Sequence, residues 1–123
     1  MDTNAVIEFL GGTLPNSGSN WLQNIVEENL HHLSVINQIE LMGFNSSSAE
    51  MQTLEAFIDV TNVLPLSDIV AQKTIELRKK HKIKLPDAII AATALAYKLT
   101  LISRNIKDFQ RIDGLLCVDA HQI

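Results

Sequence analysis

The sequence has 123 residues, of which 46% are hydrophobic, a formal net charge of −4 and one cysteine, Cys117. This length and apolar content predict one compact domain over residues 1–123. A lone cysteine excludes an intramolecular disulfide and a site built on several thiolates, which suits a reducing, cytoplasmic setting. No apolar run approaches the roughly 20 residues that cross a bilayer, so we expect no membrane partner.

Secondary-structure signals alternate along the chain between helical periodicity and short apolar runs. In chain order, we predict helix 3–10, helix 20–30, strand 31–36, helix 38–44, helix 51–60, strand 60–66, helix 68–81, helix 87–98, strand 99–103 and strand 114–118. Gly11 and Gly12 are expected to end the first helix, and Ser19 and Ser67 to cap two others. Pro86 suits the first turn of its helix.

The alternation of helices with strands that are continuous apolar runs predicts an α/β fold. Such strands are typical of a parallel sheet that is covered on both faces, because neither face can then be exposed to water. We therefore expect a three-layer α/β/α sandwich whose connections are right-handed crossovers.

Acidic and amide side chains lie just after predicted strands or at the starts of predicted helices, and reactive groups in open α/β folds collect at the sheet edge where strands end. They are Asp2, Glu40, Asp87, Asn105 and Asp108. Each has a structural explanation when taken alone. Asn37 and Glu40 have the spacing of a capping box, Asp87 is an ordinary acidic first turn, Asp108 can start a turn and Asp2 can be a frayed terminus.

Several carboxylates at one edge repel one another, and a hard cation between them relieves that repulsion. Mg²⁺ or Mn²⁺ suits oxygen ligands of this kind. A bound ion of this type can lower the pKa of water and steady a leaving oxygen, which makes phosphodiester hydrolysis the implied chemistry.

The basic residues are unevenly distributed, since half of the ten fall in the stretch "RKKHKIK". They are Arg78, Lys79, Lys80, Lys82 and Lys84. Two interpretations remain open: a solvated helix end whose cations complement the dipole, or a contact for a nucleic-acid backbone.

Three segments, "MDTNAVIEFL", "LSVINQIELMGF" and "LPDAIIAATALAYKLTLISRNIKDF", resemble in order and spacing the PIN-domain ribonucleases, and most closely the VapC-type toxins of toxin–antitoxin pairs. The similarity covers nearly the whole chain, and its last segment is the most specific. It implies an α/β/α sandwich with a parallel sheet and a Mg²⁺- or Mn²⁺-dependent endoribonuclease site.

By motif position, the resemblance matches Asp2, Glu40 and Asp87 to the family's three acids, and places the fourth at Asn105 with Asp108 as the alternative. It implies that Asp2, Asp87 and Asp108 hold the metal, and that Glu40 and Asp108 orient metal-bound water. The hydrogen bonds of the site are expected from Ser103 and Asn105, with Asn4 in support. Implied partners are an antitoxin that blocks the site, an RNA substrate and a second copy in a homodimer.

The sequence departs from the family pattern at two places. Asn105 keeps an oxygen that can act as a ligand but removes a charge, which weakens cation binding unless Asp108 compensates. The family's first strand, which is central in the sheet, precedes its Asp-Thr-Asn, whereas here only Met1 precedes Asp2. We therefore expect a fold without that strand, and hypothesise a truncated or mis-started chain.

Two functions follow from these residues. The first is a metal-dependent endoribonuclease that acts as a toxin. The second is a catalytically impaired protein of the same fold that binds antitoxin or RNA without cutting. An aspartyl-phosphate enzyme built on Asp2 is disfavoured, because that chemistry usually requires a second aspartate where Asn4 lies.

Overall fold

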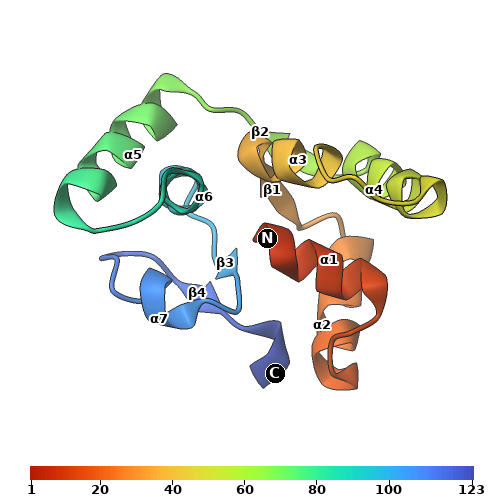
Figure 1. Cartoon of the computed structure of the whole chain (residues 1–123). Helices are drawn as coiled ribbons and strands as arrows, with labels where there is room; N and C mark the ends of the chain where they lie inside the picture. The colour runs from red at the N-terminus through yellow and green to blue at the C-terminus, as the bar shows by residue number, and fades with distance from the viewer.

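The computed structural model describes residues 1–123, and its elements alternate as an α/β fold requires (Figure 1). They are α1 (Thr3–Gly11), α2 (Asn16–Glu27), β1 (His32–Ser34), α3 (Val35–Met42), α4 (Ser48–Asp59), β2 (Asn62–Leu64), α5 (Asp68–Lys80), α6 (Leu85–Ala96), β3 (Leu101–Ile102), α7 (Ile106–Phe109), β4 (Cys117–Val118) and the 3₁₀ helix η1 (Ala120–Gln122). None of the helices combines the length and the apolar character that a bilayer crossing demands.

Local sequence signals predicted several helix ends correctly. Gly12 ends α1 in the left-handed conformation with φ 71°, as glycine allows. Ser67 caps α5 by accepting a hydrogen bond from Val70 N at 3.3 Å. Pro86 lies in the first turn of α6, where its missing N–H costs nothing.

The predicted strand 31–36 is too long, because α3 begins at Val35. Ser34 Oγ accepts from Ile36 N at 3.2 Å, and Asn37 Oδ1 accepts from Ser34 N at 2.9 Å. This pair is the capping box of α3, so the box expected between Asn37 and Glu40 is wrong. The cap competes with strand pairing and ends β1 two residues early.

The predicted helix 20–30 starts too late, since α2 already begins at Asn16 and contains Ser19, which was expected to cap it. Gly18 misled the prediction, because glycine in a helix is usually unfavourable. Here it serves a close approach: a Cβ at Gly18 would lie 1.9 Å from the carbonyl oxygen of Ala120. The unpredicted η1 therefore packs directly on the backbone of α2.

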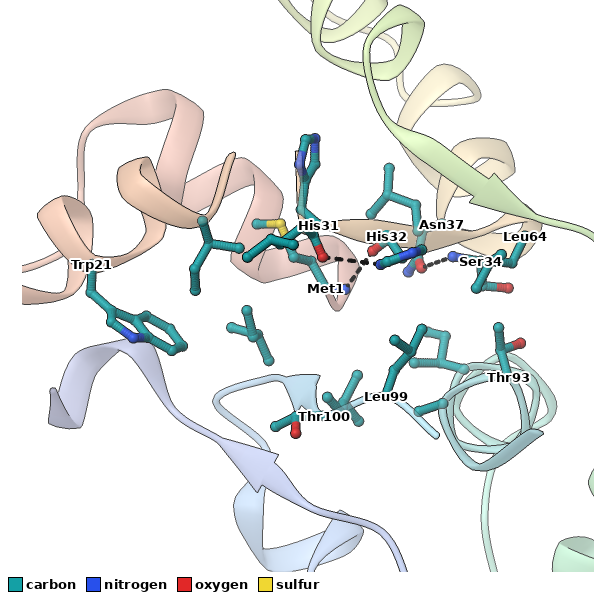
Figure 2. A pocket seen from close by; sticks show the side chains of 17 residues that line it. Met1, Trp21, His31, His32, Ser34, Asn37, Leu64, Thr93, Leu99 and Thr100 are labelled. Carbon is teal, nitrogen blue, oxygen red and sulfur yellow. Dashed lines mark hydrogen bonds between the residues drawn. The ribbon is translucent and has the colours of Figure 1, made fainter. Parts of the chain in front are cut away.

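The strands are parallel, as predicted, but form two sheets of two strands rather than one sheet. β1 pairs with β2, and β3 pairs with β4. Met1 and Asp2 lie between the two pairs: the α-amino group of Met1 donates to His32 O at 2.9 Å, and Asp2 N donates to Ile102 O at 2.8 Å. Met1 and Asp2 thus link β1 to β3 through hydrogen bonds, where the sequence was expected to lack a central strand. Figure 2 shows Met1 beside His32.

A cavity of about 260 Å³ extends from Met1 between the facing edges of β1 and β3. Its walls are mostly apolar and include Trp21 of α2 and Ile90 of α6 (Figure 2 shows Trp21 at one end). The cavity lies between the two sheets, so no ladder of backbone hydrogen bonds joins β1 directly to β3.

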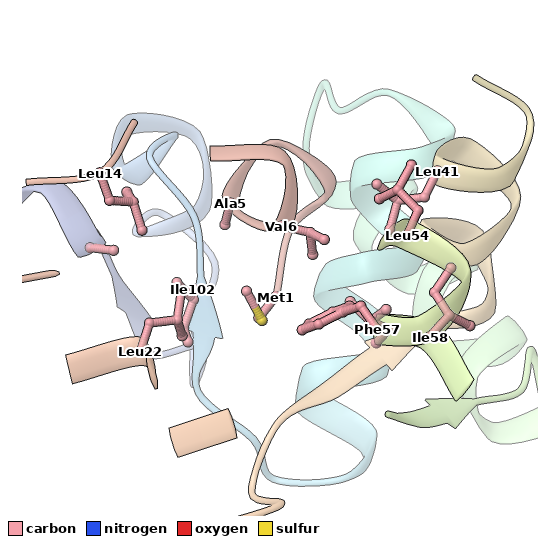
Figure 3. Packing of buried hydrophobic residues seen from close by; sticks show 12 residues of the cluster. Met1, Ala5, Val6, Leu14, Leu22, Leu41, Leu54, Phe57, Ile58 and Ile102 are labelled. Atoms are coloured by element: carbon pink, nitrogen blue, oxygen red, sulfur yellow. The ribbon is translucent and has the colours of Figure 1, made fainter. Parts of the chain in front are cut away.

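Buried side chains form two clusters on opposite faces of the strands. One cluster gathers around Met1, whose side chain lies between Phe57 and Ile102 (Figure 3). The other is built on α5 and α6 and contains Leu101. Because the neighbours Leu101 and Ile102 point to different clusters, β3 is covered on both faces, and the three-layer prediction is confirmed.

Candidate active site

Asp2 follows Met1 between the two sheets and directly precedes the first turn of α1. Its Oδ1 accepts from Thr3 N at 2.8 Å, so it is the N-cap of that helix. Its Oδ2 accepts from Ser103 Oγ at 2.9 Å, from the residue that follows β3. Asp2 is therefore a fixed carboxylate at the end of two strands and not a frayed terminus.

The segment after β3 carries a chain of hydrogen bonds that includes three predicted site residues. The buried Ser103 Oγ accepts from Asn105 N at 3.0 Å while it donates to Asp2. Asn105 Nδ2 donates to Asp108 Oδ2 at 3.0 Å. The amide of Asn105 thus holds Asp108, which supplies the negative charge that position 105 lacks.

Glu40 projects from α3 toward the first turn of α1. Thr3 Oγ1 donates to Glu40 Oε1 at 2.7 Å, and Asn37 Nδ2 donates to Thr3 Oγ1 at 3.0 Å. Sequence reasoning assigned Asn37 only a capping role and gave Thr3 none. The i, i+3 spacing of Asn37 and Glu40 was the available signal, and it was attributed to a cap.

Asp87 joins these acids through its charge. Burial is the main cause that raises the pKa of this carboxyl, and the charges of Asp2 and Glu40 raise it further. Lys84 opposes the shift, and Asp108 adds a smaller repulsion. Asp87 therefore interacts electrostatically with the three other predicted acids, Asp2, Glu40 and Asp108.

The donor set fits a divalent cation in charge and atom type, because it consists of carboxylates: three of them act on the fourth, Asp87, and Lys84 is the one cation that opposes their effect. No three His, Cys, Asp or Glu side chains approach closely enough to ligate one ion as they stand. The site is therefore an electrostatic match for Mg²⁺ or Mn²⁺ rather than a finished coordination shell.

Other predicted residues lie around this site without contacting its acids. Asn4 is exposed on α1 and makes no side-chain hydrogen bond. Arg78, Lys79 and Lys80 form the exposed last turn of α5, where they complement the helix dipole. Exposed Lys82 and Lys84 then lead into α6, next to the acids.

Arg111 was missed by sequence reasoning, and no spacing marks it. Its guanidinium donates to Lys82 O at 2.7 Å and to Asp108 O at 3.1 Å. This bridge ties the basic segment to the turn that carries Asp108.

Cys117 lies on β4 and is not a nucleophile. Burial, with a smaller contribution from Asp2, raises the pKa of its thiol to about 11. The thiol is therefore protonated at neutral pH and chemically quiet.

Comparison with known proteins agrees with this fold. The family profile described as PIN domain matches residues 1–115, and the chain belongs to the PIN-domain family. Its structural neighbours include toxin–antitoxin complexes of the VapBC kind. No curated protein matched the sequence.

Three solved structures illustrate the similarity. A chain of the toxin–antitoxin complex from Klebsiella pneumoniae is 31% identical, with 99% of this chain and 97% of that chain covered and a TM-score of 0.77. A chain of VapBC2 from Rickettsia felis bound to a promoter DNA fragment is 26% identical, with 96% of this chain and 95% of that chain covered and a TM-score of 0.80. A chain of DNA-bound VapBC from Salmonella typhimurium is 27% identical, with 97% of this chain and 95% of that chain covered and a TM-score of 0.75.

Proposed function

We propose that this chain is the toxin of a type II toxin–antitoxin pair and a Mg²⁺- or Mn²⁺-dependent endoribonuclease. The observation that carries the proposal is a set of hydrogen bonds that anchors three of the acids. Ser103 Oγ donates to Asp2 Oδ2 at 2.9 Å, Asn105 Nδ2 donates to Asp108 Oδ2 at 3.0 Å, and Thr3 Oγ1 donates to Glu40 Oε1 at 2.7 Å. The pKa of Asp87, which is raised first by burial and then by the charges of Asp2 and Glu40, supports the same function, because perturbed carboxylates are typical of functional sites.

Asp2, Asp87 and Asp108 would hold the ion, and Glu40 would orient the attacking water. The bound cation would supply an acidic water and stabilise the charge that develops on the phosphate. Ser103 fixes one oxygen of Asp2 by donating to it, which leaves the carboxylate in one rotamer. Asn105 does the same for Asp108. The acids are thus oriented before any ligand arrives.

The proposed RNA contact is the exposed basic segment formed by Arg78, Lys79, Lys80, Lys82 and Lys84. Cations beside a carboxylate site draw in a phosphate backbone that the acids alone would repel. Lys84 is nearest in effect, since its charge acts on Asp87. The complexes named above support a cognate antitoxin as partner. A homodimer of this chain is a further part of the proposal.

A second candidate is a catalytically impaired binding protein. It is favoured by the separation of the carboxylates, no three of which are close enough to ligate one ion. It also accounts for an uncharged Asn105 whose amide is already bonded to Asp108.

The test compares wild type, Asp87→Asn and, as a matched control, Asp113→Asn, whose exposed side chain makes no hydrogen bond. Each is purified free of partner proteins, and its Tm and cleavage of single-stranded RNA are measured with and without Mn²⁺ or Mg²⁺. The enzyme predicts that the ion raises the Tm of wild type and Asp113→Asn only, and that Asp87→Asn does not cut. If the ion shifts the Tm of none of the three proteins while all three bind RNA equally well, the second candidate, a binding protein that does not cut RNA, is the function.

A further inference from the structure

The hydrogen bonds between α3 and α1 form a chain with one direction. Its members, in order, are Ser34 N, Asn37, Thr3 and Glu40. Asn37 is 1% exposed, so its amide has no water to replace a lost partner. The chain therefore starts at a buried amide of fixed orientation and ends at the exposed hydrogen bond between Thr3 and Glu40.

Its direction follows from which groups can only donate and which can only accept. A backbone N–H can only donate, so the end of the Asn37 amide that faces Ser34 N at 2.9 Å must be Oδ1. The other end is then the NH₂ group, which can only donate, and it faces Thr3 Oγ1 at 3.0 Å. The Thr3 oxygen accepts there, and its single proton is directed to Glu40 Oε1 at 2.7 Å.

We propose that Asn37 is a positioning residue for Glu40, which acts through the Thr3 hydroxyl and holds the carboxylate against the start of α1. Glu40 is exposed and lies on α3, whereas Asp2 caps α1, so the two acids belong to different elements. The chain from Asn37 couples these elements at the point where both acids lie. The importance of this position for chemistry rests on the proposed nuclease function.

Thr3→Val removes the hydroxyl and keeps the branched shape, whereas Thr3→Ser keeps the hydroxyl. Asn37→Asp keeps an oxygen for Ser34 N but has no amide to donate, so the Thr3 proton turns to the new carboxylate instead of Glu40. Ser34→Ala is the control, because it removes the cap to Ile36 N and leaves the chain through Asn37 intact.

We expect Thr3→Val and Asn37→Asp to lower kcat for RNA cleavage by about 10- to 100-fold, as losses around active-site ligands do, with little change in KM. The double variant should be no worse than either single one, because both changes break the same chain. Thr3→Ser should retain activity, and Ser34→Ala should lose stability but not kcat. Equal kcat in wild type and Thr3→Val would overturn the proposal.

Crystal structures of the same variants test the inference without activity. The Glu40 carboxylate should stay within hydrogen-bond distance of residue 3 in wild type and Thr3→Ser, and turn to solvent in Thr3→Val and Asn37→Asp. A Glu40 that keeps its place in Thr3→Val refutes the positioning role even if the wild type cuts RNA. A wild type that does not cut refutes the nuclease and leaves this structural outcome to decide the chain.

Discussion

Replacing Gly18 by alanine should detach the C-terminal helix η1 from α2. The added Cβ would lie 1.9 Å from Ala120 O and 2.9 Å from Ala120 C, whereas contacts below 3.0 Å essentially never occur. Backbone must therefore move by at least 1.1 Å, the difference between 3.0 and 1.9 Å, because no flexible side chain can yield. Overpacking of this kind costs about 1–3 kcal/mol.

Displacement of η1 has further consequences that raise this cost. Ala120 would lose its burial, and Ser17 Oγ would lose its hydrogen bond to Ile123 O at 2.8 Å, which is a loss of about 1 kcal/mol. The pair of His121 and Glu8 would also separate. We expect Gly18→Ala to lower the free energy of unfolding by about 2–4 kcal/mol in total.

Gly11→Ala is the matched control, because a Cβ there meets nothing within 4 Å. It should leave stability unchanged or raise it by up to about 1 kcal/mol, as alanine favours a helix. Urea denaturation at constant pH measures both variants against wild type. If Gly18→Ala is as stable as Gly11→Ala, the close approach of η1 to α2 does not exist in solution.

Three further outcomes are expected. Asp87→Asn should raise the free energy of unfolding of the metal-free protein by a few tenths to about 1 kcal/mol, because it removes a partly exposed charge that other acids repel. If the Tm of Asp87→Asn is lower than the Tm of Asp113→Asn, the acids do not repel one another as proposed. Burial lowers the pKa of His31, with smaller contributions from His32 and the α-amino group. As the pH falls, the unfolded chain therefore takes up a proton on His31 before the folded protein does, and the free energy of unfolding should fall below about pH 6.5. Urea titrations should show a weaker pH dependence of stability in His31→Gln. Four apolar residues fused before Met1 should fill the cavity between β1 and β3 and raise the Tm above that of an equally long Gly-Ser fusion, whereas equal Tm values would show that the two sheet edges do not accept a strand.

The sequence was sufficient where one local signal determined the structure. Gly12 and Ser67 determined helix ends because conformational freedom and a capping hydroxyl act within a few residues. Asp2 and Asp87 were placed at helix starts for a related reason, since an acid at a cap or in a first turn is favoured there by the helix itself.

Prediction failed where distant residues decided the outcome. Gly18 looked like a loop residue until Ala120, far along the chain, proved to lie against it. Asn37 looked like the partner of Glu40, but Ser34 takes that role and frees its amide for Thr3. The split of the sheet could be foreseen only as a missing strand, because pairing between strands has no signature within either strand.

The hydrogen bond between Asp2 and Ser103 spans 101 positions of the sequence and so determines when the site can form. During synthesis, the first acid leaves the ribosome at once, but its anchoring hydroxyl and Asp108 emerge only near the end of translation. A nascent chain therefore carries its acids apart from one another. A nuclease of the kind proposed above would acquire its site only when its synthesis is nearly complete.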